Sequence, residues 1–102
     1  MLLGKVFKNL DQKFKSIKFK NISFNSKDCK SNYIFFAISG NRFNGNNYIN
    51  HAIKNGAKII VSNLKFEGLN KDKILFIRSK NPRKTLSDVA SRFYKDKPNN
   101  II

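Results

Sequence analysis

Two polar segments carry the side chains best suited to binding a ligand. One, Phe24-Asn25-Ser26-Lys27, precedes a strongly apolar run, and the other, Ser39 to Gly45, follows it. Together they offer hydroxyls, amides, a guanidinium and aromatic rings, which can hydrogen-bond and stack a nucleotide. Loops at strand ends of α/β sheets commonly hold such ligands. A plainer interpretation is also open, in which Ser26 caps a turn, Asn44-Gly45 forms another and Phe43 belongs to the core.

Groups for catalysis or metal binding are sparse. The sequence has no G-x-x-x-x-G-K-[ST] or G-x-G-x-x-G loop, and its six acidic residues are dispersed. The single histidine, His51, fits the surface or edge of a helix better than a catalytic base. The single cysteine, Cys29, has no disulfide partner and no nearby histidine, so we expect a loop or semi-buried residue. We therefore predict no catalytic residue and no metal site in this chain.

The formal net charge of +15 permits binding to nucleic acid. However, the basic residues are scattered from Lys5 to Lys97, and the chain is equally rich in Asn, Ile and Phe. We interpret most of this charge as composition and solvated faces, which could still help to attract a diphosphate. No specific nucleic-acid partner is expected, although a basic nucleic-acid-binding module remains an alternative.

Length and composition indicate one folded domain over residues 1–102. A chain of 102 residues, 40% of them hydrophobic, can bury a single core. No apolar run reaches membrane-spanning length, and the N-terminus lacks a signal-peptide pattern, so no membrane partner is expected. The single cysteine fits a reducing compartment, and we expect a cytoplasmic protein.

The first part of the chain gives weak structural signals. Over residues 1–16, apolar residues at helical spacing predict a short, basic, amphipathic opening; they are Leu3, Val6, Phe7 and Leu10. From Ile17 to Phe24 the alternation of apolar and polar residues slips at Lys20-Asn21. This pattern predicts two short strands or a bulge.

The remainder predicts an α/β fold. The run Tyr33 to Ile38 is typical of a strand covered on both faces, and Lys58 to Ser62 and Ile74 to Ile77 predict two more. Between the first two, Ile49, Ala52 and Ile53 repeat at helical spacing, with Asn46 or Asn47 as cap and Gly56 as a left-handed stop. A second helix opens at Asn81-Pro82, and its apolar stripe is Leu86, Val89, Ala90 and Phe93. We predict a small, largely parallel or mixed β-sheet flanked by helices.

Five pieces of the sequence, in order and at matching spacing, resemble a known family. They are NSK, YIFFAISG, NGNNYINHAIKNGAKIIV, ILFIRS and a helix ending in SRFYKDKP. This order is similar to the N-terminal domain of the Mur ligases, and SRFYKDKP favours the tripeptide synthetases, which add the third residue of the peptidoglycan stem peptide. The related ligases that add D-alanyl-D-alanine share several of these elements and remain the alternative. The resemblance covers about residues 22–102.

The resemblance implies a substrate-binding role. In the family this domain holds the UDP end of UDP-N-acetylmuramoyl-L-alanyl-D-glutamate, while ATP and Mg²⁺ bind the central domain and the amino acid binds the C-terminal one. Carried over by motif, the UDP-binding residues would be Phe24, Ser26, Asn41, Arg42 and Phe43. The chain would then be a non-catalytic part of an ATP-dependent ligase, with the remainder of that ligase as its partner.

The sequence departs from the family pattern around these positions. Asn25 replaces the acid of the D-S-R motif but keeps a capping acceptor, and Lys27 replaces the arginine, which loses bidentate geometry but keeps the charge. Asn44 stands where the family has an acid before Gly45. The serine itself is retained, so these changes bear on the turns more than on the assignment.

Overall fold

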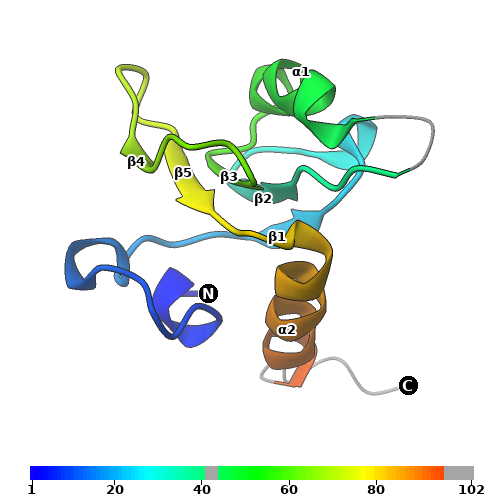
Figure 1. The fold of residues 1–102 in the computed structure, drawn as a ribbon. Coiled ribbons are helices and arrows are strands. Elements are labelled where there is room, and N and C mark those ends of the chain that lie inside the picture. Colours follow the sequence, from blue (N-terminus) through cyan, green and yellow to red (C-terminus); the bar gives the residue numbers. More distant parts are fainter. Residues whose placement is uncertain (41–43, 96–102) are drawn as a thin grey trace.

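The computed structural model describes residues 1–40 and 44–95, which form an α/β domain around one mixed sheet (Figure 1). The strand order is β1-β2-β3-β5-β4, and only the edge strand β4 is antiparallel to its neighbour. The strands are β1 (Asn21–Ser23), β2 (Tyr33–Phe36), β3 (Ile59–Ser62), β4 (Gly68–Leu69) and β5 (Leu75–Arg78). The predicted fold class is confirmed, as are the three apolar strands.

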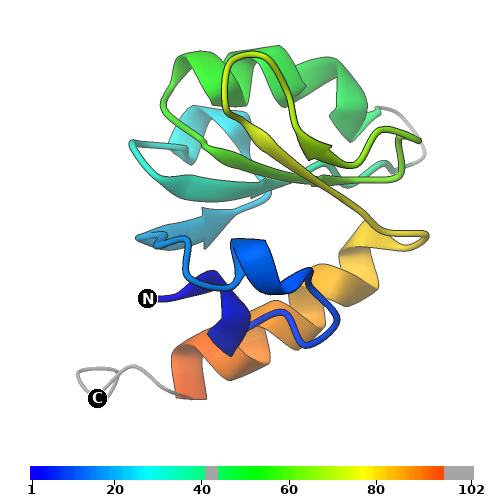
Figure 2. The same ribbon diagram turned by 90° about the vertical axis from the view of Figure 1, so that its left-hand side faces the viewer.

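Alternation along the central strands supplies two cores. In β2, Ile34 and Phe36 point into one core and Phe35 into the other, because successive side chains leave opposite faces of a strand. The first core is closed by the N-terminal segment and α2 (Pro82–Lys95), and the second by α1 (Ile49–Lys54). Figure 2 shows these layers, with α1 above the sheet and α2 and the N-terminal segment below it.

Helix α2 forms as the sequence predicts. Asn81 caps it, since its Oδ1 accepts a hydrogen bond from the Lys84 backbone N–H at 3.2 Å, and Pro82 occupies the first helical position. Of the predicted stripe, Val89 and Phe93 are buried, and the other two members are half-buried.

The opening segment differs from the prediction. The helical spacing of its apolar residues does not correspond to an α-helix, and the segment contains two 3-10 turns, η1 (Leu3–Lys5) and η2 (Gln12–Phe14). The physical reason is long-range pairing: the Leu3 N–H donates to the Ile17 carbonyl at 2.7 Å, and the Phe19 N–H donates to the Met1 carbonyl at 2.9 Å. A chain that folds back on itself in this way cannot continue a helix.

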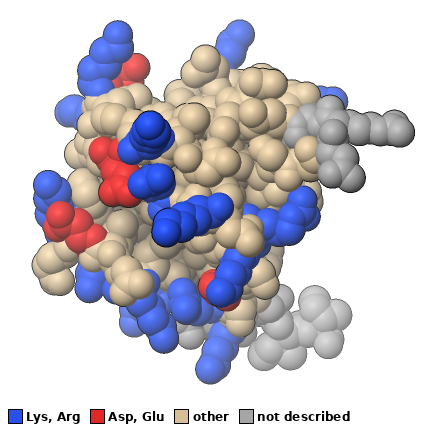
Figure 3. Space-filling model, viewed as in Figure 1, with Lys and Arg blue, Asp and Glu red and all other residues tan. Residues whose placement is uncertain are grey.

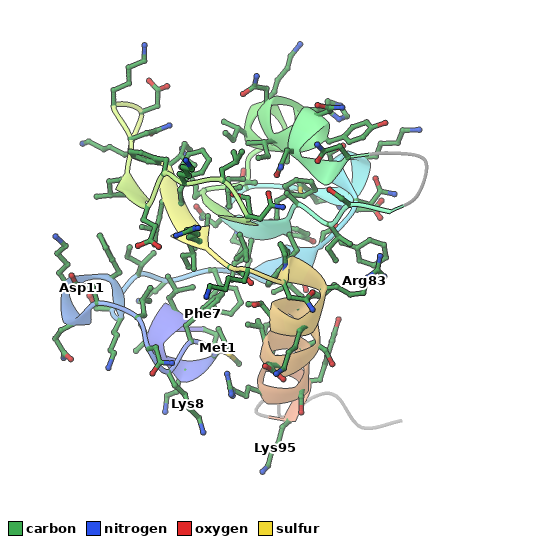
Figure 4. All side chains as sticks on the ribbon, in the orientation of Figure 1. Met1, Phe7, Lys8, Asp11, Arg83 and Lys95 are labelled. Atoms are coloured by element: carbon green, nitrogen blue, oxygen red, sulfur yellow. The ribbon has the colours of Figure 1, made fainter. Side chains whose placement is uncertain are left out.

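The same pairing explains the stretch 17–24. It holds one bridge, between Leu2 and Lys18, followed by the single strand β1, and not two strands. The segment is also tied to α2, because the Arg92 guanidinium donates to the Val6 carbonyl at 2.8 Å. Figure 4 shows Met1 and Phe7 where the segment approaches α2.

Basic side chains are spread over the face seen in Figure 3, with tan surface between them, and do not form one continuous stripe. Lys8 and Lys95, labelled in Figure 4, extend away from the fold. Within residues 1–40 and 44–95, no helix combines the length and apolarity needed to cross a membrane.

Candidate functional site

The two polar segments meet at one edge of the sheet. Because β1 and β2 are parallel, the residues that follow each strand emerge at the same edge. The segment Phe24 to Lys27 leaves β1, and the described ends of the second segment, residues 39–40 and 44–45, lie beyond the end of β2. The first segment thus follows β1 as well as preceding β2. Residues of the first segment and Gly45 of the second line a shared pocket of about 410 Å³. Its lining consists of Phe24, Asn25, Ser26, Lys27, Phe35, Gly45, Tyr48 and His51.

Ser26 is the buried polar group of this pocket, with only 5% of its surface exposed. It begins the short turn η3 (Ser26–Asp28), which Asn25 caps by accepting the Lys27 N–H at 3.0 Å. The capping role expected of Asn25 is confirmed, and the interpretation of Ser26 as only a turn cap is wrong. In Figure 1 this cyan segment rises from β1 to the level of α1.

The Ser26 hydroxyl contacts α1. Its Oγ lies 2.8 Å from Nδ1 of His51, and the Asn55 side-chain amide donates to the Ser26 backbone carbonyl at 2.9 Å. The same amide nitrogen lies 3.5 Å from Nε2 of His51. His51 is an exposed residue on α1, as predicted, but it also touches the site, which the sequence did not indicate.

The described ends of the second segment, Ser39 and Asn44-Gly45, pack tightly against the end of β2. Asn44 Oδ1 accepts hydrogen bonds from the Ser39 hydroxyl at 2.8 Å and the Asn46 N–H at 2.9 Å. A Cβ on Gly45 would overlap the backbone of Ile38, so a side chain at this position would push the loop off the strand. Gly45 thereby keeps the turn η4 (Gly45–Tyr48) beside the pocket.

This geometry corrects the predicted helix cap. Neither Asn46 nor Asn47 caps α1; Asn44 caps η4, and α1 continues from it with Tyr48 at the N-cap and no side-chain capping bond. The cap lies earlier because the chain enters α1 through a 3-10 turn, in which the Asn46 N–H donates to Asn44 Oδ1 and the Asn47 N–H donates to the Asn44 carbonyl at 3.0 Å.

Of the five predicted site residues, the structure describes Phe24 and Ser26, and it brings both to the pocket. Asn41, Arg42 and Phe43 lie outside the described residues. Phe24 is 64% exposed, which leaves its ring available for stacking. Phe35, Tyr48 and His51 also line the pocket and were not predicted, while Gly45 lines it from the end of the predicted second segment. The one local signal was the i, i+4 spacing of His51 and Asn55, which places both on one side of a helix.

Cys29, at the end of η3, is buried and contributes no nucleophile to the site. Burial raises the pKa of its thiol to about 11 by disfavouring the thiolate, and the neighbouring Asp28 carboxylate adds to the effect. The thiol is therefore neutral at physiological pH. Among the residues that the structure describes, no group of three or more His, Cys, Asp or Glu side chains could hold a metal ion.

These features define an α/β domain with a candidate ligand pocket at the carboxyl edge of parallel strands. The family profile described as "Mur ligase family, catalytic domain" matches residues 18–94. The chain belongs to the Mur ligase family.

Relatives and solved structures agree with this membership. The chain is 37% identical to the UDP-N-acetylmuramoyl-L-alanyl-D-glutamate–2,6-diaminopimelate ligase of Rickettsia prowazekii, over 92% of this chain and 19% of the relative. It is 42% identical to the ligase of the same name from Clostridium tetani, over 92% of this chain and 20% of that protein. The chain thus spans about a fifth of the length of these relatives.

Similar solved structures include MurF ligases. A crystal structure of MurF from Acinetobacter baumannii superposes with a TM-score of 0.65 at 18% identity, over 82% of this chain and 18% of that one. MurF from Thermotoga maritima, solved in complex with ADP, gives 0.57 at 30% identity, over 70% of this chain and 16% of that one. The first likeness supports the fold alone.

Proposed function

We propose that this chain binds the UDP end of UDP-N-acetylmuramoyl-L-alanyl-D-glutamate for a peptidoglycan ligase. The observation that carries the proposal is the buried Ser26 hydroxyl, placed in a pocket beside the exposed ring of Phe24. A pocket with one directed hydroxyl and aromatic walls suits a nucleobase, which needs both stacking and hydrogen bonds.

Three lining residues and the three predicted residues of the second segment have separate parts in this proposal. Phe24 offers a ring face to the base, and Ser26 offers a hydrogen bond to it or to the ribose. Lys27 is exposed and brings a positive charge toward the diphosphate. Asn41, Arg42 and Phe43 complete the contacts from the second segment, and the guanidinium of Arg42 suits phosphate oxygens.

Catalysis belongs to the remainder of the ligase in this proposal. There, the glutamate carboxylate would take the γ-phosphoryl group of Mg²⁺-bound ATP to form an acyl phosphate and release ADP, and the amine of the incoming amino acid would then displace inorganic phosphate. This chain grips a part of the substrate remote from that carboxylate. Such remote contacts position the substrate for the reaction. The expected setting is the cytoplasm, where nucleotide-linked precursors and ATP are available.

The relatives favour a ligase that adds the third stem-peptide residue. Their names specify addition of 2,6-diaminopimelate, at 33–42% identity, so this is the first amino acid to test. The alternative is the ligase that adds D-alanyl-D-alanine, since the solved neighbours include a structure named as a D-alanyl-D-alanyl ligase, from Acinetobacter baumannii. We prefer the former because its relatives match 92% of the chain at higher identity.

The test is a calorimetric titration of the chain with UDP, comparing Ser26→Ala with the parent. Loss of a desolvated hydrogen bond leaves its ligand partner unpaired, which corresponds to about 1–3 kcal/mol, or roughly 5- to 150-fold in affinity. Ser87→Ala, which removes an exposed hydroxyl from α2, is the matched control and should bind as the parent does. A Ser26→Ala chain with unchanged UDP affinity would refute the site.

A further inference from the structure

The contact between Ser26 and His51 determines which hydrogen-bonding group the serine offers to a ligand. Ser26 Oγ lies 2.8 Å from Nδ1 of His51, so one of the two atoms carries the shared hydrogen. If the hydroxyl donates to the ring, its hydrogen is used and only its lone pairs face the pocket. If the ring donates to the hydroxyl, the hydroxyl hydrogen is free to meet a ligand.

Asn55 decides between these two states. Its side-chain nitrogen lies 2.9 Å from the Ser26 carbonyl, which can only accept, so this terminal atom must be the NH₂ group and not the oxygen. The amide orientation is thus fixed by its partner. The same NH₂ group lies 3.5 Å from Nε2 of His51.

An NH₂ group facing Nε2 favours a ring nitrogen that carries no hydrogen. Two N–H groups pointed at each other would repel, whereas a bare Nε2 accepts. In the neutral imidazole the hydrogen then resides on Nδ1, which donates to Ser26 Oγ. Asn55, one turn beyond His51 on the same side of the helix, therefore sets the tautomer of the ring and, through it, the direction of the hydroxyl hydrogen.

The geometry points to His51 as a positioning residue that turns the Ser26 hydroxyl hydrogen into the pocket. The site then requires an acceptor oxygen from its ligand at this point, such as a carbonyl or ribose oxygen, and discriminates against an N–H group. This inference rests on the proposed function for the identity of the ligand. The hydrogen-bonding state of the His51 ring is inferred independently of the proposed function.

The ring state is measured first, without ligand. Long-range ¹H–¹⁵N correlation spectra of the folded chain, recorded at a pH where the imidazole is neutral, should show hydrogen on Nδ1. In Asn55→Ala the preference should shift toward Nε2. A folded parent chain with hydrogen mainly on Nε2 would overturn the inference, whatever the chain binds.

The ligand effect is measured second, by UDP titration of matched variants. His51→Asn places an amide nitrogen where Nδ1 stood, so it can donate to Ser26 and should keep the affinity within about threefold. His51→Asp places only acceptor oxygens there, so the carboxylate accepts the hydroxyl hydrogen of Ser26. This change should weaken UDP binding by roughly 5- to 100-fold. Asn50→Ala, at the exposed neighbouring position of α1, is the control for changes to the helix.

A double-mutant cycle separates positioning from charge. In a Ser26→Ala background the hydroxyl is gone, so His51→Asp should retain only the effect of its negative charge on an anionic ligand. Equal losses in both backgrounds would overturn the inference. If the parent chain binds no UDP, the proposed function fails, and the tautomer measurement alone decides this inference. Amide spectra of each variant verify that it is folded.

Discussion

Of the two described glycines with positive φ, Gly56 and Gly68, replacement of Gly56 with alanine should destabilise the fold more. Gly56 follows α1 with φ +118°, a conformation that L-residues rarely adopt. A Cβ there would lie 2.6 Å from the Ser31 backbone nitrogen and 2.7 Å from the Lys30 carbonyl carbon. Both are backbone atoms, so neither can swing aside. The Gly56 carbonyl also accepts the Asn32 N–H at 2.9 Å, which fixes α1 against the entry to β2.

The magnitude follows from two contributions. Left-handed backbone at an alanine costs about 1–2 kcal/mol, and forcing a methyl group into a packed site adds about 1–3 kcal/mol. The expected loss of unfolding free energy is therefore about 2–5 kcal/mol, a large share of the roughly 5–15 kcal/mol typical of such domains.

Gly68 provides a matched control for this prediction. It has φ +101°, but no atom of the described residues lies within 4 Å of the position that a methyl group would take, so Gly68→Ala carries only the conformational contribution. Urea unfolding followed by circular dichroism gives both changes. The reasoning is refuted if Gly56→Ala is no more destabilising than Gly68→Ala at equal m values.

Two further predictions concern reactivity and charge. Cys29 should react with a thiol reagent at pH 8 about 100-fold more slowly in the folded chain than in urea, because a pKa of about 11 against an ordinary 9.0 leaves a hundredth of the thiolate. Since the folded pKa is the higher one, the contribution of the thiol to the free energy of unfolding should be complete below about pH 9 and lost toward pH 11. The loss of stability between these pH values should therefore be larger in the parent than in Cys29→Ala. Equal reactivity in the two states would contradict the burial. Binding to nucleic acid should be weak, independent of sequence and strongly reduced between 50 and 200 mM salt. Fluorescence anisotropy with labelled oligonucleotides of random and of fixed sequence measures this. A tight, sequence-selective complex at physiological salt would favour a basic nucleic-acid-binding module.

The central strands and α2 could be predicted because their signals are local. An apolar run such as Tyr33 to Ile38 must be buried on both faces, and Asn81-Pro82 specifies a helix start through its own chemistry. Gly56 likewise predicts the positive φ at the end of α1, because glycine adopts such a backbone conformation without steric cost. These features need no knowledge of distant residues.

The opening segment and the site were less accessible because distant contacts decide them. Leu3 and Ile17 pair across 14 positions, and no periodicity within residues 1–16 shows this bond. Ser26 and His51 are 25 positions apart, so only the packing of α1 on η3 brings their side chains together. The two-residue strand β4 is too short to give a pattern at all.

The most direct measurement of the central claim is an amide chemical-shift titration of the chain with UDP. The account predicts shifts concentrated in Phe24 to Lys27 and in residues 40–51, with little change in α2. Shifts that cluster on α2 or on the N-terminal segment, or no shift at millimolar UDP, would contradict it.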